Sequence, residues 1–454
     1  MSEAKIQKYS YRTVLTFMTI FICLFLVSFS IAPAFLENYG GKAERLEMLL
    51  DRNYKDASNL IRPDEVRQME EEDPDCDIAY MNYKASSVAA RGMNYSATAV
   101  LTSWKYPQLF KMDMIRGAFF TEASAQKGRN TAVISNTLAE KLFTTYDVVG
   151  NEITLLGQKY SIVGVYKNNN SLISFLNSDG VEKVFIPFES VLDPKKDPVE
   201  DLVVQGGVLA GEKFRQYQLE NNLRENYYIN TGFYKTTDYY EASVLIDQFS
   251  RILLLLIGVG LIFELLKQYR KSVANYTGNL KQSFGSEYLG DMLKRPRLAY
   301  FQIVPVTLAL AVFIVGILFI VRFSFYIPNS LLPQNNIFDF GFYWDKIKEA
   351  IYSSNGMTGF AASQLSVEYS TALKLSGVLA LLSAIGLLLV LWGLRLFREL
   401  NKGWKSKLTV LLIAASAAIV IYTIISFAIG VNWHIPGKEL LLTMVFLTVK
   451  TYSN

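Results

Sequence analysis

The chain has 454 residues, of which 51% are hydrophobic, and a formal net charge of +4 at pH 7. That length exceeds one ordinary domain, and the mean hydropathy of +0.20 reflects apolar residues concentrated in a few segments. Most of the basic excess flanks those segments, so it gives no reason to expect a nucleic-acid partner. Cys23 lies in the first apolar segment and Cys76 in a polar one, which excludes a disulfide framework and predicts a buried free thiol at Cys76.

Five segments are apolar enough to form membrane-spanning helices, because each approaches or exceeds the ~20 residues that cross ~30 Å of hydrocarbon. They are predicted at residues 14–35, 244–266, 300–323, 373–397 and 408–430. The first is read as an anchor and not as a cleaved signal peptide, because its apolar run is long and no small-x-small cleavage site follows. The second carries Asp247, Arg251 and Glu264 near its ends, where long side chains reach the interface. Five spans place the C-terminal tail, 431–454, outside. Leu440 to Val449 is too short to cross by itself, although a tilted or partly polar sixth span from Ile435 stays open.

The positions of Lys and Arg predict the orientation. Basic residues fill 1–13, 267–299 and 398–407, which are therefore expected in the cytoplasm. The longer connection 324–372 holds only Lys346 and Lys348 after its first apolar residues. It is therefore expected outside the cell membrane, together with residues 36–243.

The composition and hydrophobic pattern of residues 36–243 predict one soluble α/β (α+β) domain inserted between the first two spans. The pattern predicts a strand at 132–135 followed by a helix at 136–143, whose Leu138 and Leu142 share one face. Two further strands, 152–156 and 160–166, are joined by a tight hairpin at Gly157. Another strand is predicted at 184–187, a helix at 211–225 and a return strand at 227–234.

Several blocks of this domain, in order and at family spacing, resemble the periplasmic core domain of the macrolide exporter (MacB) family of ABC permeases. The blocks are Met114–Glu122, Ala132–Ser135, Leu138–Phe143, Val149–Ile153, Tyr160–Tyr166 and Val184–Phe188. The chain departs from the family at Ala118, where an arginine is usual. The glycines in the blocks read as turn and close-packing positions, so the blocks specify a fold and no catalytic residue.

Residues Asn279 to Leu289, in the connection 267–299, resemble a segment of the FtsX-type permease domain that forms a short helix docking on the ATPase subunit. By that resemblance the ATPase-coupling surface comprises Gln282, Ser283, Phe284, Gly285, Ser286, Tyr288 and Leu289. The other reading is a short helix that lies flat on the inner leaflet, held there by its basic residues.

The resemblance implies a permease subunit of a type VII ABC transporter in the bacterial plasma (inner) membrane. The chain has no P-loop motif, so it is not expected to be an enzyme or to bind a cofactor itself. ATP and Mg would be bound by a cytoplasmic ABC ATPase dimer. The implied mechanism is mechanotransmission, in which Leu36 to Leu50 and Tyr239 to Leu266 act as levers that move the outer domain. The single histidine, His434, and the acidic run Glu70 to Asp73 lack the pattern of a metal site.

The remaining partners follow from the same resemblance. A second permease chain, identical or different, is expected, and an extracytoplasmic adaptor, lipoprotein or envelope enzyme is a candidate third partner. The first functional reading is export or extrusion of a peptide, antibiotic or lipid-linked client. The alternatives are an FtsX-like non-transporting regulator of a cell-envelope enzyme and a lipoprotein-releasing permease. The chain departs from the family in two ways. It has a fifth span where four are usual, and its connection 324–372 is longer than expected and rich in aromatic residues. Those aromatic residues are interpreted as interfacial anchors or as a partner-binding loop.

Overall fold

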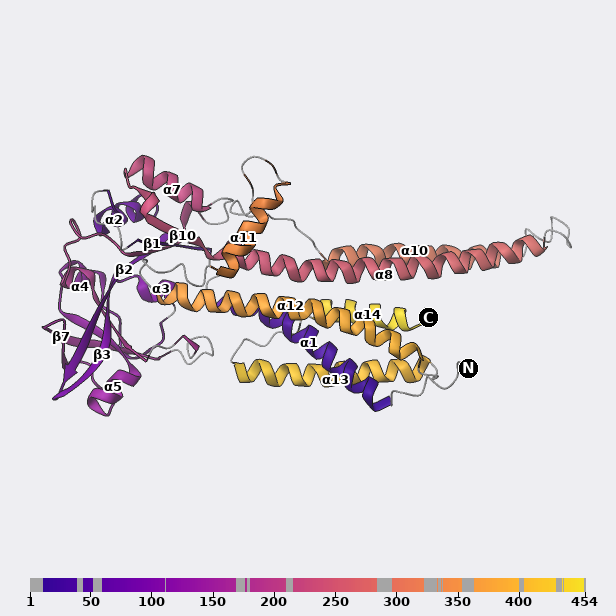
Figure 1. Cartoon of the computed structure of the whole chain (residues 1–454), viewed down its shortest axis with the longest axis horizontal. Coiled ribbons are helices and arrows are strands. Elements are labelled where there is room, and N and C mark those ends of the chain that lie inside the picture. The colour runs from indigo at the N-terminus through magenta and orange to yellow at the C-terminus, as the bar shows by residue number, and fades with distance from the viewer. Residues whose placement is uncertain are drawn as a thin grey trace. The chain divides into compact units, whose positions relative to one another are not determined.

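The computed structural model describes residues 11–38, 44–51, 59–110, 112–168, 176–177, 180–209, 215–283, 296–321, 333, 336, 338–352, 363–399, 404–429, 435 and 437–452. The chain divides into two compact units (Figure 1). The helical unit comprises Met1–Phe35, Leu245–Tyr326 and Lys374–Asn454. The sheet unit comprises Leu36–Val244 and Ile327–Leu373.

The sheet unit is built on a ten-stranded mixed sheet with the order β10-β1-β9-β2-β3-β8-β5-β7-β4, and β6 pairs with β2 and β7. The β3–β8 and β5–β7 pairs are parallel, and the other pairs are antiparallel. The strands are β1 (Arg45–Leu50), β2 (Cys76–Ala90), β3 (Met93–Thr102), β4 (Met114–Gly117), β5 (Thr131–Ser135), β6 (Glu152–Leu155), β7 (Gln158–Tyr166), β8 (Glu182–Pro187), β9 (Asp201–Gly206) and β10 (Tyr234–Asp238).

Side chains of β1 alternate between the two faces of the sheet, as the period of two in a strand requires. Leu46, Met48 and Leu50 join the main apolar cluster of the sheet unit. Arg45 and Glu47 point to the opposite face, yet both are buried. A charged face that is nevertheless buried must find polar partners, and this face carries the site described below.

The sheet unit also contains short helices: α2 (Pro63–Glu72), α3 (Tyr106–Phe110), α4 (Glu122–Gln126), α5 (Asn136–Phe143), α7 (Arg215–Asn226) and α11 (Phe340–Tyr352). In α5, the Ser135 hydroxyl accepts the N–H of Leu138 at 3.0 Å and so caps the helix. Leu138 and Leu142 lie in the core, as the sequence pattern predicts.

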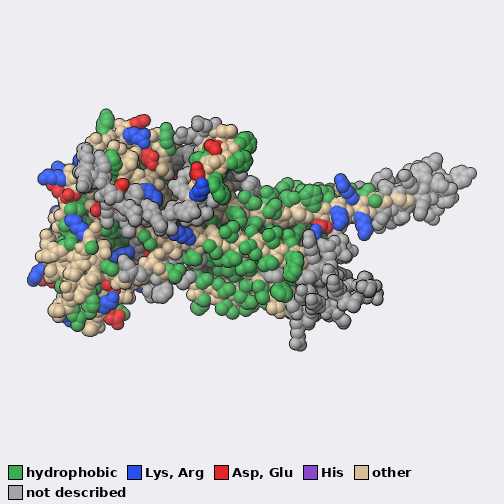
Figure 2. Space-filling view, viewed as in Figure 1, with side chains coloured by type: hydrophobic (Ala, Val, Ile, Leu, Met, Phe, Trp, Pro, Cys, Tyr) green, Lys and Arg blue, Asp and Glu red, His purple; other side chains and the backbone are tan. Residues whose placement is uncertain are grey.

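The helical unit contains long apolar helices. They are α1 (Tyr11–Asn38), α8 (Tyr239–Ser283), α10 (Pro296–Val321), α12 (Gln364–Glu399), α13 (Trp404–Ile429) and α14 (Gly437–Tyr452), with α8 and α12 beginning in the sheet unit. Among the described residues, four stretches are apolar enough, by length and composition, to cross a membrane: Leu15–Ala34, Tyr239–Ala274, Leu365–Gly393 and Lys405–Ile429. Val306–Val321 of α10 is a shorter apolar helix. Figure 2 shows a broad hydrophobic surface over these helices, whereas charged side chains gather on the sheet unit and, as basic side chains, on the far part of α8. Exposed apolar side chains such as Leu308, Leu388 and Phe427 suit contact with lipid.

The predicted strands at 132–135, 152–156, 160–166 and 184–187 and the helix at 136–143 are confirmed as β5, β6, β7, β8 and α5. The strand predicted at Tyr227 to Tyr234 is wrong, because a 3-10 turn, Thr231–Phe233, capped by Asn230, precedes β10 at Tyr234. The lever predicted at Leu36 to Leu50 is wrong at its end, since Arg45–Leu50 is a fully buried strand inside the sheet.

The structure also shows the surroundings of the two cysteines and of the acidic run Glu70 to Asp73. Both cysteines are free and buried, and burial raises the pKa of the Cys76 thiol to about 12. A thiol with that pKa is protonated at neutral pH and therefore unreactive. The acidic run ends α2, where Glu70 pairs with Lys105 at 3.0 Å and Glu72 accepts the Tyr227 hydroxyl at 2.6 Å. His434 lies outside the described residues.

Candidate functional site

The coupling surface predicted from the sequence lies at the end of α8 and beyond it. Gln282 and Ser283 are the last two residues of α8, which continues without a break from Tyr239. Phe284, Gly285, Ser286, Tyr288 and Leu289 lie outside the described residues. Residues 267–283, predicted as part of the cytoplasmic connection, therefore extend the helix of the second span, and the coupling surface itself stays a prediction.

The other end of α8 enters a buried polar site in the sheet unit, which we call the helix joint. Its centre is the carboxylate of Glu47 on β1, whose residue has no solvent exposure. Tyr239, the first residue of α8, donates its hydroxyl to Glu47. Ser363, immediately before α12, donates its hydroxyl to the other carboxylate oxygen. A single side chain of the sheet thus holds the beginnings of two long helices.

Ser363 also caps α12. Its hydroxyl oxygen accepts the N–H of Ser366 at 2.9 Å, which is the geometry of an N-cap. The positive end of the α12 dipole consequently lies beside the Glu47 carboxylate and favours its negative charge. Tyr239 reaches the same carboxylate from the first turn of α8.

Direct contacts join the two helices to each other. The Tyr369 hydroxyl of α12 donates to the backbone oxygen of Tyr239 at 2.9 Å. The two rings meet edge to face, with centroids 4.2 Å apart and an interplanar angle of 87°. Such aromatic pairs stabilise a contact beyond the area that they bury. Tyr239 is therefore bound at its hydroxyl, its ring and its backbone.

Asp201 on β9 makes a carboxyl pair with Glu47. The two residues are diagonal neighbours on one face of the antiparallel β1–β9 pair, because Glu47 lies opposite Val203 and Leu49 lies opposite Asp201. Tyr83 of β2 donates its hydroxyl to Asp201 Oδ2 at 2.7 Å. Asp201 Oδ1 is buried and meets no donor among the described residues.

The surroundings of this pair favour a proton on one of its two carboxyl groups. Burial raises the pKa of Asp201 well above its usual range, and the neighbouring Glu47 carboxylate raises it further. Burial also raises the pKa of Glu47, against the hydroxyl bonds from Ser363 and Tyr239, which lower it. Because Glu47 receives those hydroxyls, we assign the charge to Glu47 and the proton to Asp201. A protonated Asp201 can then donate to Glu47 through the oxygen that lacks a donor.

A second cluster fixes the first turn of α8. Asp238 Oδ1 accepts the N–H of Tyr240 at 2.9 Å and that of Glu241 at 3.3 Å, so Asp238 is the N-cap of α8. The side chains of Arg215 on α7 and of Asp238 are both almost inaccessible, and Arg215 pairs with Asp238 at 3.2 Å and with Glu44 at 3.1 Å. The guanidinium also lies 4.6 Å from the centre of the Tyr240 ring.

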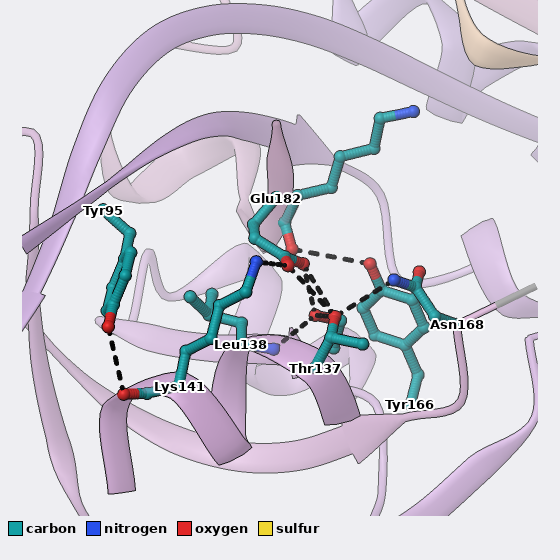
Figure 3. Close-up of polar contacts among 9 residues, drawn as sticks. Tyr95, Thr137, Leu138, Lys141, Tyr166, Asn168 and Glu182 are labelled. Carbon is teal, nitrogen blue, oxygen red and sulfur yellow. Dashed lines mark hydrogen bonds and ion pairs between the residues drawn. The ribbon is translucent and has the colours of Figure 1, made fainter. Parts of the chain in front are cut away.

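A further polar network surrounds Glu182 on β8 (Figure 3). Lys141 Nζ lies 2.7 Å from its carboxylate, Ser135 Oγ lies 2.7 Å away and Thr137 Oγ1 3.0 Å away. The lysine and the hydroxyls lower the pKa of Glu182 although burial opposes them. Asn168 donates to Thr137 at 3.1 Å and closes the network. Because every group faces a partner, this network serves to join β8 to α5 and leaves no group free for chemistry.

Sequence reasoning missed the helix joint. Glu47 and Asp201 are charged residues in strands that are otherwise largely apolar, Arg45–Leu50 and Asp201–Gly206. That interruption of an apolar strand was the available signal. The pairing partners, Tyr239 and Ser363, are far away in the sequence and carry no pattern of their own.

Comparison with known proteins gives a match that includes most of α1 and strands β1 to β9 of the sheet unit. Residues 15–219 match the family model of the MacB-like periplasmic core domain. Among solved structures, the chain is similar to the periplasmic region of MacB from Actinobacillus actinomycetemcomitans. The identity is 10%, the TM-score is 0.37, and the match covers 45% of this chain and 94% of that one.

It is also similar to the extracellular domain of the noncanonic ABC-type transporter YknZ from Gram-positive bacteria. There the identity is 16%, the TM-score is 0.33, and the match covers 43% of this chain and 100% of that one. None of the curated proteins matches the chain. The matched residues include Glu47 and Asp201 of the helix joint, whereas Tyr239 and Ser363 lie beyond them.

Proposed function

We propose that this chain is a permease of the MacB-like ABC transporters, whose periplasmic core domain its residues 15–219 match, and that it converts ATP hydrolysis by a separate ATPase into movement of its outer sheet unit. The family implies an ABC ATPase as partner. The sequence, which lacks a P-loop, agrees with an ATPase on another polypeptide. Export or extrusion of a client outside the membrane is the role that we propose for this movement.

The observation that carries the proposal is the continuity of α8. The helix has 45 residues, which at 1.5 Å per residue gives roughly 67 Å. The hydrocarbon core of a bilayer is only ~30 Å thick. A helix of this length can begin in the sheet unit, cross the membrane and still extend several turns beyond it. An unbroken helix transmits an axial displacement, whereas a flexible connection would absorb it.

The helix joint supplies the outer attachment of this lever. Tyr239 is bound to Glu47 of β1, and Asp238 caps the helix while paired with Arg215 of α7. Force on α8 would therefore reach a strand in the interior of the sheet and a helix packed beside it. Through Ser363, force on α12 would reach the same carboxylate.

The inner attachment in this proposal is the predicted coupling surface. Gln282 and Ser283 belong to the same helix as Tyr239, so an ATPase that bound Gln282 to Leu289 would act on the lever without an intervening joint. This arrangement favours docking on the ATPase over a helix lying flat on the inner leaflet.

Purification in mild detergent, followed by mass spectrometry, tests the proposal. A P-loop ATPase should be recovered with the wild-type chain. It should be lost, or lose its coupling, with the double variant Phe284→Ala/Leu289→Ala. Phe338→Ala, at an exposed aromatic of the outer connection, is the matched control and should leave recovery unchanged. Wild-type recovery and coupling in the double variant would remove these residues from the docking surface.

The other proteins recovered separate the roles open to such a permease. An adaptor protein supports export, and a secreted hydrolase supports an FtsX-like regulator. A second permease chain with an outer-membrane route supports lipoprotein release. Recovery of no ATPase under conditions that keep the chain folded would contradict the proposed function itself.

A further inference from the structure

We propose that α14 is a short sixth membrane pass that runs parallel to α8 and is fastened to it by the Lys450–Glu264 ion pair. The C-terminus then lies on the same side of the membrane as the end of α8. This inference rests on the proposed orientation of α8. It concerns the helical unit alone, to which α14 and residues 245–283 of α8 both belong.

The first observation is that α14 is packed among the membrane helices. Leu442, Phe446 and Leu447 are buried in the apolar cluster of the helical unit, together with Leu254, Ile257 and Leu261 of α8. The helix also lies against α10 and α13. A helix resting on the bilayer surface would instead keep one long face in water and would not enter the interior of a helix bundle.

The second observation fixes the direction of α14. A Cβ added at Gly260 of α8 would lie 3.1 Å from the Phe446 ring, so helix and ring touch there. One turn further along both helices, Lys450 pairs with Glu264. Lys450 and Glu264 are 186 positions apart in the chain, and Phe446 and Gly260 are separated by the same number. A constant separation means that the helices run in the same direction, since antiparallel helices would keep a constant sum.

This register places α14 at the level of the apolar stretch of α8. If the separation of 186 positions holds along the whole of α14, Lys438 lies level with Ile252 and Tyr452 lies level with Leu266. Ile252 to Leu266 is the uninterrupted apolar part of α8 apart from Glu264, bounded by Arg251 and Lys267. Both stretches have 15 residues (266 − 252 + 1 and 452 − 438 + 1), or roughly 22 Å of helix.

A pass of that length is shorter than an average hydrocarbon core. Bilayers accommodate short spans by local thinning, and flanking long side chains reach the interface. Lys438 and Glu439 flank α14 at one end and Lys450 at the other. Lys450 reaches the interface near the inner end of the apolar stretch of α8 while its ammonium neutralises Glu264, which is mostly buried.

Cysteine labelling tests the topology of the full chain. In a Cys23→Ala/Cys76→Ala background, single cysteines are introduced as Ser453→Cys, Ser283→Cys and Lys127→Cys. An impermeant maleimide is applied to spheroplasts before and after permeabilisation. Lys127→Cys, on the sheet unit, should react at once. Ser283→Cys and Ser453→Cys should react only after permeabilisation.

Two failures are distinguishable in this design. Labelling of Ser453→Cys in intact spheroplasts, with Ser283→Cys protected, overturns the sixth pass and leaves the proposed function standing. Labelling of Ser283→Cys in intact spheroplasts overturns the orientation on which the proposed function depends.

Charge exchange tests the ion pair. Lys450→Glu brings a second carboxylate to Glu264 and should increase labelling of Ser453→Cys in intact spheroplasts at least several-fold. The exchange variant Glu264→Lys/Lys450→Glu should return labelling toward the wild-type level. Lys450→Met, which removes the charge but keeps the long side chain, controls for misfolding and should have a smaller effect. An exchange variant no better than Lys450→Glu alone would show that the pair does not fasten α14.

Discussion

Tyr369 of α12 donates its hydroxyl to the backbone oxygen of Tyr239, the first residue of α8, at 2.9 Å. The two tyrosines lie 130 positions apart in the chain, and each begins or nearly begins a long apolar helix. Their contact therefore joins the first turns of two long apolar helices within the sheet unit.

Removing that hydroxyl should weaken the helix joint. Tyr369→Phe keeps the ring contact but leaves the Tyr239 backbone oxygen without this donor, so we expect a loss of about 1 kcal/mol of unfolding free energy. Thermal unfolding of the detergent-purified chain measures it. Tyr228→Phe, at a tyrosine that is 79% exposed, is the control and should leave the midpoint unchanged. Equal midpoints for both variants would mean that the bond does not contribute.

The Glu47–Asp201 pair should make stability depend on pH. Burial and Glu47 raise the pKa of Asp201 in the folded chain, whereas in the unfolded chain its pKa is about 3.9. The folded state therefore keeps a proton that the unfolded state releases. This contribution is complete below about pH 3.9, and it decreases as pH rises toward the folded pKa.

Asp201→Asn should remove that dependence, because asparagine is uncharged and can still donate to Glu47. Across pH 5 to 8, wild-type stability should fall more steeply than that of Asp201→Asn, by at most about 1.4 kcal/mol per pH unit for one proton. Unfolding midpoints at several pH values measure both slopes. Asp201→Ala, which removes the donor as well, should be less stable than Asp201→Asn. Parallel slopes for the wild type and Asp201→Asn would contradict a proton on Asp201.

Asp238 should stabilise the first turn of α8 in two ways, as its N-cap and through its ion pair with Arg215. Asp238→Asn keeps an oxygen for the N–H groups of Tyr240 and Glu241 but weakens the pair with Arg215. Asp238→Ala loses both, and we expect it to cost about 1 kcal/mol more than Asp238→Asn. Hydrogen exchange of the amides at 240–242 should report the loss locally. Equal protection in the two variants would exclude the capping role.

Gly117 should not tolerate a side chain. Its φ is +64°, and a Cβ there would lie 2.1 Å from the backbone oxygen of Val163 on β7. Gly92 has a φ of +79° with nothing within 4 Å. Gly92→Ala should therefore cost only the backbone strain of about 1–2 kcal/mol, and Gly117→Ala clearly more. Chemical unfolding compares them, and similar costs would mean that β4 and β7 can separate without penalty.

The elements that sequence predicted well are those whose signals are local. The helix at 136–143 has a serine cap and two leucines one turn apart, and the hairpin at Gly157 has its turn residue. The apolar helices are visible from length and hydropathy alone. The strand predicted at 227–234 failed because its aromatic residues suit a strand, whereas Asn230 caps a turn there and the pairing with β1 begins only at Tyr234.

The helix joint could not be predicted because its signal is not local. Glu47 and Ser363 are 316 positions apart, and nothing near Ser363 in the sequence names a carboxylate partner. The extent of α8 was likewise missed, since residues 267–283 are polar and were read as a connection. Their helix continues that of the second span, and polarity alone does not reveal continuity.

Ser363 and Tyr369 make the boundaries of the sheet unit discontinuous in the chain. A soluble fragment cut at 36–243 would contain Glu47 and Tyr239 but neither the hydroxyl of Ser363 nor the ring of Tyr369. In such a fragment, the Glu47 carboxylate and the backbone oxygen of Tyr239 would lose their partners from α12 and become exposed to water. The sheet unit is therefore complete only when residues 363–373 are present, and a soluble version of it needs this segment joined to 36–243 by a flexible linker.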